Sequence, residues 1–219
     1  MDISNAATLD PIQHIGKMGV VPVVTVENPE AASRVAEAFL RGGLSCMEIT
    51  FRTAAAAGAI RRVTTDYPEM VLGAGTVLTT DQADQALAAG ARFIVSPGFG
   101  PRVVDWCLKH KMPTLPGVAT ATDIQMALEY GIKVLKFFPA ETLGGLKMIE
   151  ALASPFREVK FVPLGGITAE NLAGYLKSPA VFACGGTWLV TTKLIAAGNF
   201  GEIERLAREA VQIVKQVRG

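Results

Sequence analysis

The chain has 219 residues, half of them hydrophobic, and a formal net charge of +1. This balance is typical of a soluble globular protein and argues against nucleic-acid binding, which needs a strong positive charge. No stretch has the unbroken apolar length of a membrane span, and Met1–Ser4 lack the basic region and apolar core of a secretory signal. We therefore expect one domain over residues 1–219, located in the cytoplasm and without a membrane partner.

Short apolar or β-branched runs alternate with helical patterns along the chain. Eight strands are predicted, over Val20–Val26, Cys46–Thr50, Val71–Val77, Phe93–Ser96, Thr114–Val118, Lys133–Phe138, Lys160–Leu164 and Val181–Cys184. Helices are predicted over Pro29–Arg41, Asp81–Ala89, Pro101–Lys109, Thr122–Tyr130, Leu146–Ala153 and Glu202–Val217, and a further helix is expected to start in Ala54–Ala57.

Eight strands that alternate with helices, at a spacing of roughly 20 to 30 residues, predict a parallel (β/α)8 barrel, the TIM barrel. A doubly wound open sheet is the alternative, but no Gly-x-Gly-x-x-Gly turn follows the first strand. The segment before Val20 is predicted to form an extra N-terminal helix that caps the bottom of the barrel.

The cysteines and histidines do not indicate a metal site. Cys46, Cys107 and Cys184 are scattered singly, which fits neither a disulfide framework nor a zinc knuckle. Cys46 and Cys184 fall in predicted strands, so we interpret them as buried, unreactive thiols. The two histidines, His14 and His110, have no metal-ligating neighbour at a useful spacing.

Lys136 lies in an apolar run that is typical of a buried strand. Burial lowers the pKa of a lysine, and an amine that is neutral near pH 7 can attack a carbonyl to form a Schiff base. Alternation places Val134, Lys136 and Phe138 on one face of the strand. The alternative is a lysine that reaches solvent from the strand end, which is the commoner case for such a run taken alone.

Glu48 also lies inside an apolar strand. Schiff-base chemistry needs repeated proton transfers, and a carboxyl group of raised pKa beside the lysine can carry them out. The alternative is an ion pair that merely neutralises Lys136. Arg52 follows the same strand and is a candidate to hold a substrate carboxylate with its guanidinium, although a solvated arginine fits the spacing equally well.

Glycine pairs follow the seventh and eighth predicted strands, as Gly165-Gly166 and Gly185-Gly186-Thr187. Loops at these two places often bind phosphate in such barrels, because glycine lets backbone N–H groups converge on an anion. Tight turns that need a positive φ are the alternative. Two pairs at the two expected strand ends favour a phosphate site.

With these residues in place, the chain resembles the 2-keto-3-deoxy-6-phosphogluconate (KDPG) / 4-hydroxy-2-oxoglutarate aldolase family. The matching motifs are Val21–Val24, Met47–Thr53, Gly73–Leu78, Ser96–Gly98, Lys136–Glu141 and Gly165–Ile167. The resemblance implies a homotrimeric class I aldolase that needs no metal or other cofactor and acts on a small 2-keto acid.

The resemblance also implies a role for each matching residue. Lys136 corresponds to the Schiff-base lysine and Glu48 to the proton-transfer glutamate. The pyruvate end of the substrate is expected at Arg52, Thr76, Pro97 and Phe138, and the phosphate end at Gly165, Gly166 and Thr187.

The implied reaction is cleavage of KDPG to pyruvate and glyceraldehyde 3-phosphate. Cleavage of 4-hydroxy-2-oxoglutarate to pyruvate and glyoxylate, or of the galactonate-derived epimer of KDPG, is the alternative. Other classes are a metal-dependent pyruvate aldolase, a phosphate-binding barrel isomerase and a non-catalytic phosphosugar-binding barrel.

Two residues depart from the family pattern. Thr187 replaces a common serine and keeps a hydroxyl, so phosphate binding is expected to survive. Leu164 replaces a common threonine, and the loss of that hydroxyl predicts weaker discrimination of substrate hydroxyl stereochemistry.

Overall fold

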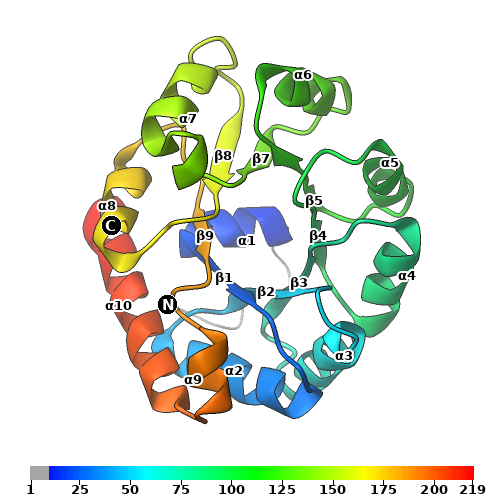
Figure 1. Ribbon diagram of the computed structural model, residues 1–219, viewed down its shortest axis with the longest axis vertical. Coiled ribbons are helices and arrows are strands. Elements are labelled where there is room, and N and C mark those ends of the chain that lie inside the picture. The colour runs from blue at the N-terminus through cyan, green and yellow to red at the C-terminus, as the bar shows by residue number, and fades with distance from the viewer. Residues whose placement is uncertain (1–9) are drawn as a thin grey trace.

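A computed structural model describes residues 10–219, and its strands form a ring surrounded by helices (Figure 1). The strands are β1 (Val20–Val24), β2 (Cys46–Thr50), β3 (Val71–Gly75), β4 (Phe93–Val95), β5 (Thr114–Leu115), β6 (Gly117–Val118), β7 (Val134–Phe137), β8 (Lys160–Pro163) and β9 (Cys184–Gly186). The helices are α1 (Pro11–Met18), α2 (Pro29–Gly42), α3 (Ala56–Asp66), α4 (Thr80–Ala89), α5 (Pro101–Lys109), α6 (Ala121–Glu129), η2 (Glu141–Leu143), α7 (Gly145–Ala153), α8 (Ala169–Lys177), α9 (Thr192–Ala196) and α10 (Phe200–Arg218).

The strands pair in the sequence order of a barrel. One sheet has the order β5-β4-β3-β2-β1-β9 and the other the order β6-β7-β8, with parallel pairing throughout. β5 and β6 adjoin through Pro116, and the parallel bridge between Phe161 and Val181 connects β8 to the segment that leads into β9. The (β/α)8 barrel is confirmed over the doubly wound open sheet. The predicted single domain and the prediction on Met1–Ser4 involve residues 1–9, which lie outside the described residues.

The predicted fifth strand, Thr114–Val118, is interrupted in the structure. Proline has no backbone N–H to donate to a ladder, and β5, which pairs with β4, ends before Pro116. The carbonyl of Pro116 accepts a 3.0 Å hydrogen bond from Lys136 N–H, and the chain continues from Gly117 as β6, which pairs with β7. Gly117 is required at its position, because a Cβ atom there would overlap the carbonyl of Pro97 on the next strand end.

The predicted eighth strand, Val181–Cys184, is wrong in its position. The strand is Cys184–Gly186, paired with β1, and Val181 forms only a single bridge. The guanidinium of Arg218 donates hydrogen bonds of 2.7 Å to the carbonyls of Val181 and Phe182, which are thereby engaged outside the ladder. Gly185 and Gly186, expected in the following loop, therefore lie in β9 itself.

Helix α1 closes the N-terminal end of the barrel, as predicted. The side chain of Asp10 caps its first turn, and Pro11 occupies the first helical position, where its missing N–H costs nothing. Ile15 is completely buried and packs with the residues that line the barrel interior. These are Val21, Val23, Cys46, Val71, Phe93, Val95, Leu115, Val162, Leu164 and Ala183. Burial of a side chain such as Ile15 stabilises the fold by about 1.5–3 kcal/mol.

Sequence-encoded caps set the starts of the outer helices. Asn28 caps α2, which begins at Pro29 as predicted, and Thr79 and Thr120 cap α4 and α6, which begin one residue earlier than predicted in each case. The C-terminal helix α10 packs against α2 and α8. Gly42 permits the close approach to α2, because a Cβ atom there would lie 2.5 Å from the Cβ of Ala207.

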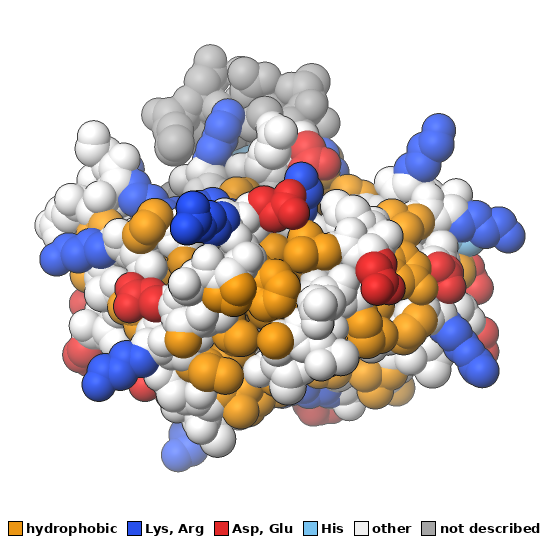
Figure 2. All heavy atoms as spheres, turned by 90° about the horizontal axis from the view of Figure 1, so that it is seen from above, with side chains coloured by type: hydrophobic (Ala, Val, Ile, Leu, Met, Phe, Trp, Pro, Cys, Tyr) orange, Lys and Arg blue, Asp and Glu red, His pale blue; other side chains and the backbone are white. Residues whose placement is uncertain are grey.

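The surface carries mixed charges and the cysteines are buried. Figure 2 shows basic and acidic side chains interspersed, with hydrophobic side chains gathered over the middle of the face on which α6 and α7 lie. The predicted burial of Cys46 and Cys184 is confirmed, and burial raises the pKa of both thiols to about 12. None of the helices between residues 10 and 219 is long and apolar enough to cross a membrane.

Candidate active site

Lys136 on β7 and Glu48 on β2 both project into the interior of the barrel. Lys136 is level with Val162 on β8, and Glu48 is level with Val23 on β1. Both valines belong to the interior cluster, and level residues of parallel neighbours point to the same face. Lys136 is 5% exposed and Glu48 is 1% exposed, so the predicted burial of both charges is confirmed.

Glycines on β3 make room for the carboxyl group. Glu48 is level with Gly73, and a Cβ atom on Gly75 would overlap the Glu48 carboxylate. A Cβ atom on Gly73 would likewise overlap the ring of Phe93. The Gly73-Ala74-Gly75 motif thus leaves a space inside the barrel that the Glu48 side chain fills.

Burial drives both groups toward neutrality. It raises the pKa of Glu48, while the positive charges of Lys136 and, to a smaller extent, Arg52 lower this pKa. It also lowers the pKa of Lys136, where Glu48 opposes the shift and Arg52 adds to it. The three side chains therefore act on one another, with desolvation the largest cause for both buried groups.

Glu48 and Lys136 do not form the ion pair that was the alternative interpretation of Glu48. Among residues 10–219, the ion pairs within 4.0 Å do not include Lys136 with Glu48. Oε1 of Glu48 is buried without a hydrogen-bond partner. A buried polar atom of this kind is costly unless a ligand or water completes it.

Further predicted site residues lie at or just after the C-terminal ends of the strands. The Nζ of Lys136 lies 5.2 Å from the ring centroid of half-buried Phe138. Arg52 is exposed in the loop after β2. Thr76 directly follows β3, and Pro97 is the second residue after β4. The hydroxyl of Ser96 donates a 2.8 Å hydrogen bond to the carbonyl of Val77. That bond ties the two loops together.

Sequence reasoning missed one pair of hydroxyl groups near this site. Thr50 is 1% exposed and its hydroxyl lies 2.8 Å from that of Thr25, which follows β1. Thr50 lies two residues after Glu48 in the same strand, so both side chains face the barrel interior. The alternation that placed Glu48 inside could have identified Thr50 as well.

Among residues 10–219, backbone N–H groups without a partner occur directly after β9 and just after β8, the strand that pairs with the Lys136 strand β7. Gly165 and Gly166 have φ values of +94° and +85°, a conformation that glycine adopts without strain. In the described chain, the N–H groups of Gly165, Gly166 and Thr187 have no hydrogen-bond partner. The turn is held by Ala140 N–H, which donates to Leu164 O at 2.7 Å. Positive φ and open N–H groups thus occur together, as an anion site requires.

The family model for KDPG and KHG aldolases matches residues 12–206. The chain belongs to this aldolase family. Among curated relatives, the 2-dehydro-3-deoxy-phosphogluconate aldolase of Treponema pallidum is 54% identical, covering 90% of this chain and 94% of its own. The KHG/KDPG aldolase of Escherichia coli K12 is 41% identical, covering 90% and 92%.

Solved structures agree with this assignment. The KDPG aldolase of Legionella pneumophila is 36% identical, with a TM-score of 0.89 over 92% of this chain and 98% of its own. That protein was captured with pyruvate as a covalent carbinolamine intermediate at low pH. The KDPG aldolase of Zymomonas mobilis ZM4 is 39% identical, with a TM-score of 0.83 over 97% and 96%.

Leu164 directly follows β8 at the barrel mouth. It is 5% exposed, and its side chain lies over β9, where a Cβ atom on Gly185 would be 2.6 Å from Leu164 Cγ. The small residue at Gly185 therefore accommodates the larger residue at position 164. This part of the mouth presents hydrocarbon instead of a hydroxyl group.

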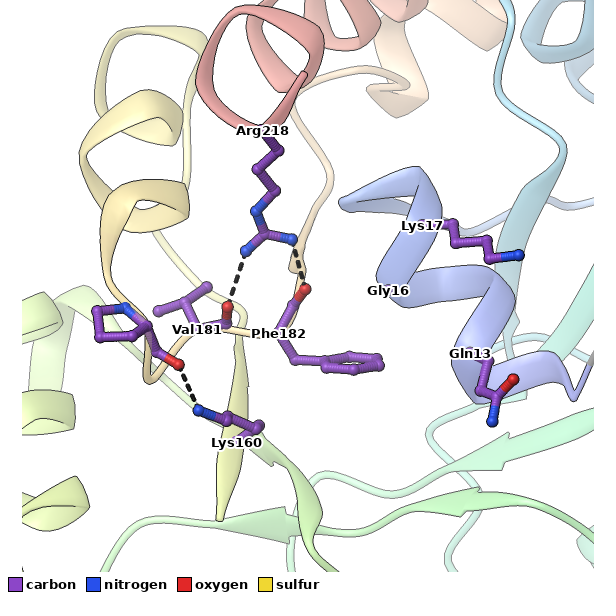
Figure 3. Close-up of a pocket in the computed structure, with 8 residues that line it drawn as sticks. Gln13, Gly16, Lys17, Lys160, Val181, Phe182 and Arg218 are labelled. Atoms are coloured by element: carbon purple, nitrogen blue, oxygen red, sulfur yellow. Dashed lines mark hydrogen bonds between the residues drawn. The ribbon is translucent and has the colours of Figure 1, made fainter. Parts of the chain in front are cut away.

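A cavity of about 480 Å³ lies at the opposite end of the aldolase barrel (Figure 3). Figure 3 shows the heads of Lys160 and Arg218 turned to backbone carbonyls, while Lys17 points away from them. The cations therefore do not converge on a common point. The lining contains none of the predicted site residues.

The described part of the aldolase offers no evident metal site. Among residues 10–219, no group of three or more histidine, cysteine, aspartate or glutamate side chains is placed to hold a metal ion.

Proposed function

We propose that this protein is a class I aldolase that cleaves KDPG to pyruvate and glyceraldehyde 3-phosphate through a Schiff base on Lys136. The observation that carries the proposal is the buried Lys136, which faces the same interior as the buried Glu48 and has no ion-pair partner within 4.0 Å among residues 10–219. The relatives named as KDPG aldolases and the relative captured with covalent pyruvate support the reaction class.

The first steps depend on the lowered pKa of Lys136. Its neutral amine attacks the C2 carbonyl of the substrate and forms a carbinolamine, in which the carbonyl oxygen has become a hydroxyl. Glu48, in its protonated form, donates a proton to that hydroxyl as it leaves as water, and the iminium ion forms. The raised pKa of Glu48, caused by burial, favours this protonated form.

Bond cleavage reverses the direction of proton transfer. The Glu48 carboxylate, now unprotonated, accepts the proton of the C4 hydroxyl while the C3–C4 bond breaks. The aldehyde departs, and the electron pair of the broken bond enters the iminium system to give an enamine. Glu48 then returns the proton to C3, and water hydrolyses the iminium to release pyruvate and the free amine.

The remaining site residues are assigned to binding. Arg52 holds the carboxylate of the pyruvate half through paired hydrogen bonds, and Thr76, Pro97 and Phe138 line that half. The open N–H groups of Gly165, Gly166 and Thr187 bind the phosphate, and the helix α8 that follows Gly166 adds a favourable dipole.

Borohydride trapping tests the proposal. Incubation with pyruvate and borohydride is expected to add a three-carbon adduct to Lys136, located by mass spectrometry, and Lys136→Met is expected to abolish it. An adduct elsewhere, or none, contradicts the proposal. Full activity in a chelator is expected, since a metal-dependent aldolase would lose it. Phosphosugar binding without turnover of any keto acid would favour the non-catalytic barrel.

A second substrate class is favoured by Leu164. Because this position presents no hydroxyl to the substrate, we propose that the enzyme also accepts the galactonate-derived epimer and 4-hydroxy-2-oxoglutarate. Relative turnover of the three acids tests this. A strict preference for KDPG would contradict it.

We also propose a homotrimer, on the basis of the family resemblance. The hydrophobic side chains gathered on the face of α6 and α7 in Figure 2 support an association surface on this side of the barrel. The partly buried Leu128, Leu146 and Met148 lie on these two helices. Light scattering at several concentrations tests the assembly. Location in the cytoplasm stays a prediction.

A further inference from the structure

Glu141 places a negative charge beside the turn that we assign to phosphate. It begins η2, four residues after the end of β7, the strand that carries Lys136, and its N–H donates a 3.0 Å hydrogen bond to the carbonyl of Gly165. A Cβ atom on Gly166 would lie 2.5 Å from Glu141 Cγ, so the side chain runs along the surface of the turn. Repulsion between two unit charges 4 Å apart in water corresponds to a loss of roughly fivefold to tenfold in affinity.

The carboxylate of Glu141 is nevertheless directed away from the turn. The atoms that approach Gly166 are Cβ and Cγ, while Oε1 lies toward Gly145, 2.8 Å from where its Cβ would be. Oε1 accepts a hydrogen bond from the hydroxyl of Tyr175 on α8. Within residues 10–219, this hydroxyl is the one side-chain partner of the Glu141 carboxylate.

Tyr175 is built to hold this bond. Its side chain is 3% exposed, and burial together with the neighbouring Glu141 raises the pKa of the phenol, so it remains a donor across the physiological range. Gly145, at φ +59°, leaves the space in which the phenol and the carboxylate meet, since a Cβ atom there would lie 2.9 Å from the Tyr175 oxygen.

We infer that Tyr175 is a positioning residue that holds the Glu141 carboxylate away from the Gly165–Gly166 turn and thereby sets the affinity for the phosphorylated half of the substrate. The inference rests on the proposed function for the assignment of phosphate to this turn. Loss of the phenol hydroxyl frees an exposed carboxylate to rotate toward the bound phosphate, where like charges repel.

The substitution Tyr175→Phe tests the inference through its selectivity between substrates. The expected KM for KDPG rises about tenfold, while kcat for KDPG and both constants for unphosphorylated 4-hydroxy-2-oxoglutarate stay within about twofold. Tyr130→Phe, which alters a tyrosine that packs on Phe99, is the matched control and is expected to change none of these values. Equal changes for both substrates, or no change, would overturn the inference.

Removing the charge should rescue the affected variant. The double variant Tyr175→Phe with Glu141→Gln is expected to regain the wild-type KM for KDPG, because the amide carries no charge. A KM that remains high would show that the phenol acts through packing alone, and would overturn the inference.

A binding measurement keeps this test independent of turnover. Inorganic phosphate is titrated into the wild type and Tyr175→Phe, followed by phosphorus NMR, and about tenfold weaker binding to the variant is expected. Equal binding, or no binding to either protein, would overturn the inference. If the wild type binds phosphate more tightly than the variant but forms no pyruvate adduct, the proposed function fails and the positioning role stands.

Discussion

The carboxylate of Glu48 occupies the space that a side chain on Gly75 would need. Both residues lie on adjacent parallel strands inside the barrel, and the carboxylate is enclosed there with Oε1 unpaired. The absence of a Cβ at position 75 is therefore part of what places the proposed proton-transfer group.

Gly75→Ala is expected to lower kcat at least about a hundredfold, because it displaces the general acid/base by an ångström or more. Gly98→Ala is the matched control, since a Cβ there has no neighbour within 4 Å. In a Glu48→Ala background, Gly75→Ala should cost little further activity or stability, because the overlap is gone. Steady-state kinetics and urea denaturation of the wild type, the three single variants and the double variant measure this. Additive losses from Gly75→Ala and Glu48→Ala would contradict the placement.

Arg52→Met is expected to move the acid limb of kcat/KM to higher pH. Arg52 lowers the pKa of Lys136, so its removal raises that pKa and leaves less neutral amine at a given pH. Arg52→Lys keeps the charge but loses the planar fork, so it should raise KM without moving the limb. pH–rate profiles distinguish the two variants, and an unmoved limb in Arg52→Met would show that its charge does not reach the lysine.

Burial of Lys136 should reduce stability below its ordinary pKa of 10.5. Folding lowers this pKa, so between the two values the unfolded chain binds more protons, and stability falls as the pH falls from 10.5. Both test proteins carry Glu48→Gln to remove the partner charge. Adding Lys136→Met is expected to raise the free energy of unfolding at pH 7 by about 1–3 kcal/mol, with the gain vanishing above pH 10.5.

The measurement is denaturation in urea at a series of pH values. Lys177→Met, at an exposed position on α8, is the control and should show no such pH-dependent gain. A gain from Lys136→Met that is equal at pH 7 and above pH 10.5 would assign the effect to packing instead of charge.

Leu164→Thr is expected to increase the preference between the gluconate- and galactonate-derived acids by about tenfold, because it returns a hydroxyl to the mouth. It should also lower stability by about 1–3 kcal/mol, since buried hydrocarbon over Gly185 is lost. Leu164→Val is the matched control, which shortens the side chain without a hydroxyl. The ratio of kcat/KM for the two acids decides, and equal ratios in both variants would contradict a role for the hydroxyl.

Local patterns in the sequence were enough to predict most of the barrel and both buried charges. Lys136 and Glu48 stand out because a charged residue inside an apolar strand is rare. The alternating strand and helix patterns likewise placed α1 beneath the barrel.

Features that depend on distant contacts escaped prediction. The shift of the last strand depends on Arg218, which lies 36 residues after Phe182. The contacts of Glu48 with Gly75 and of Leu164 with Gly185 join different strands, so no local pattern encodes them. The same holds for the bond between Tyr175 and Glu141.

Ile15 fills the N-terminal end of the barrel, and this determines the end through which substrates and products pass. With that end sealed, everything enters and exits through the mouth at the C-terminal ends of the strands. Lys136 is tethered to pyruvate in the proposed intermediate while the aldehyde half is free, so the aldehyde leaves first and pyruvate follows. In the reverse reaction, pyruvate must bind to Lys136 before the aldehyde binds. The synthetic direction is therefore an ordered two-substrate reaction.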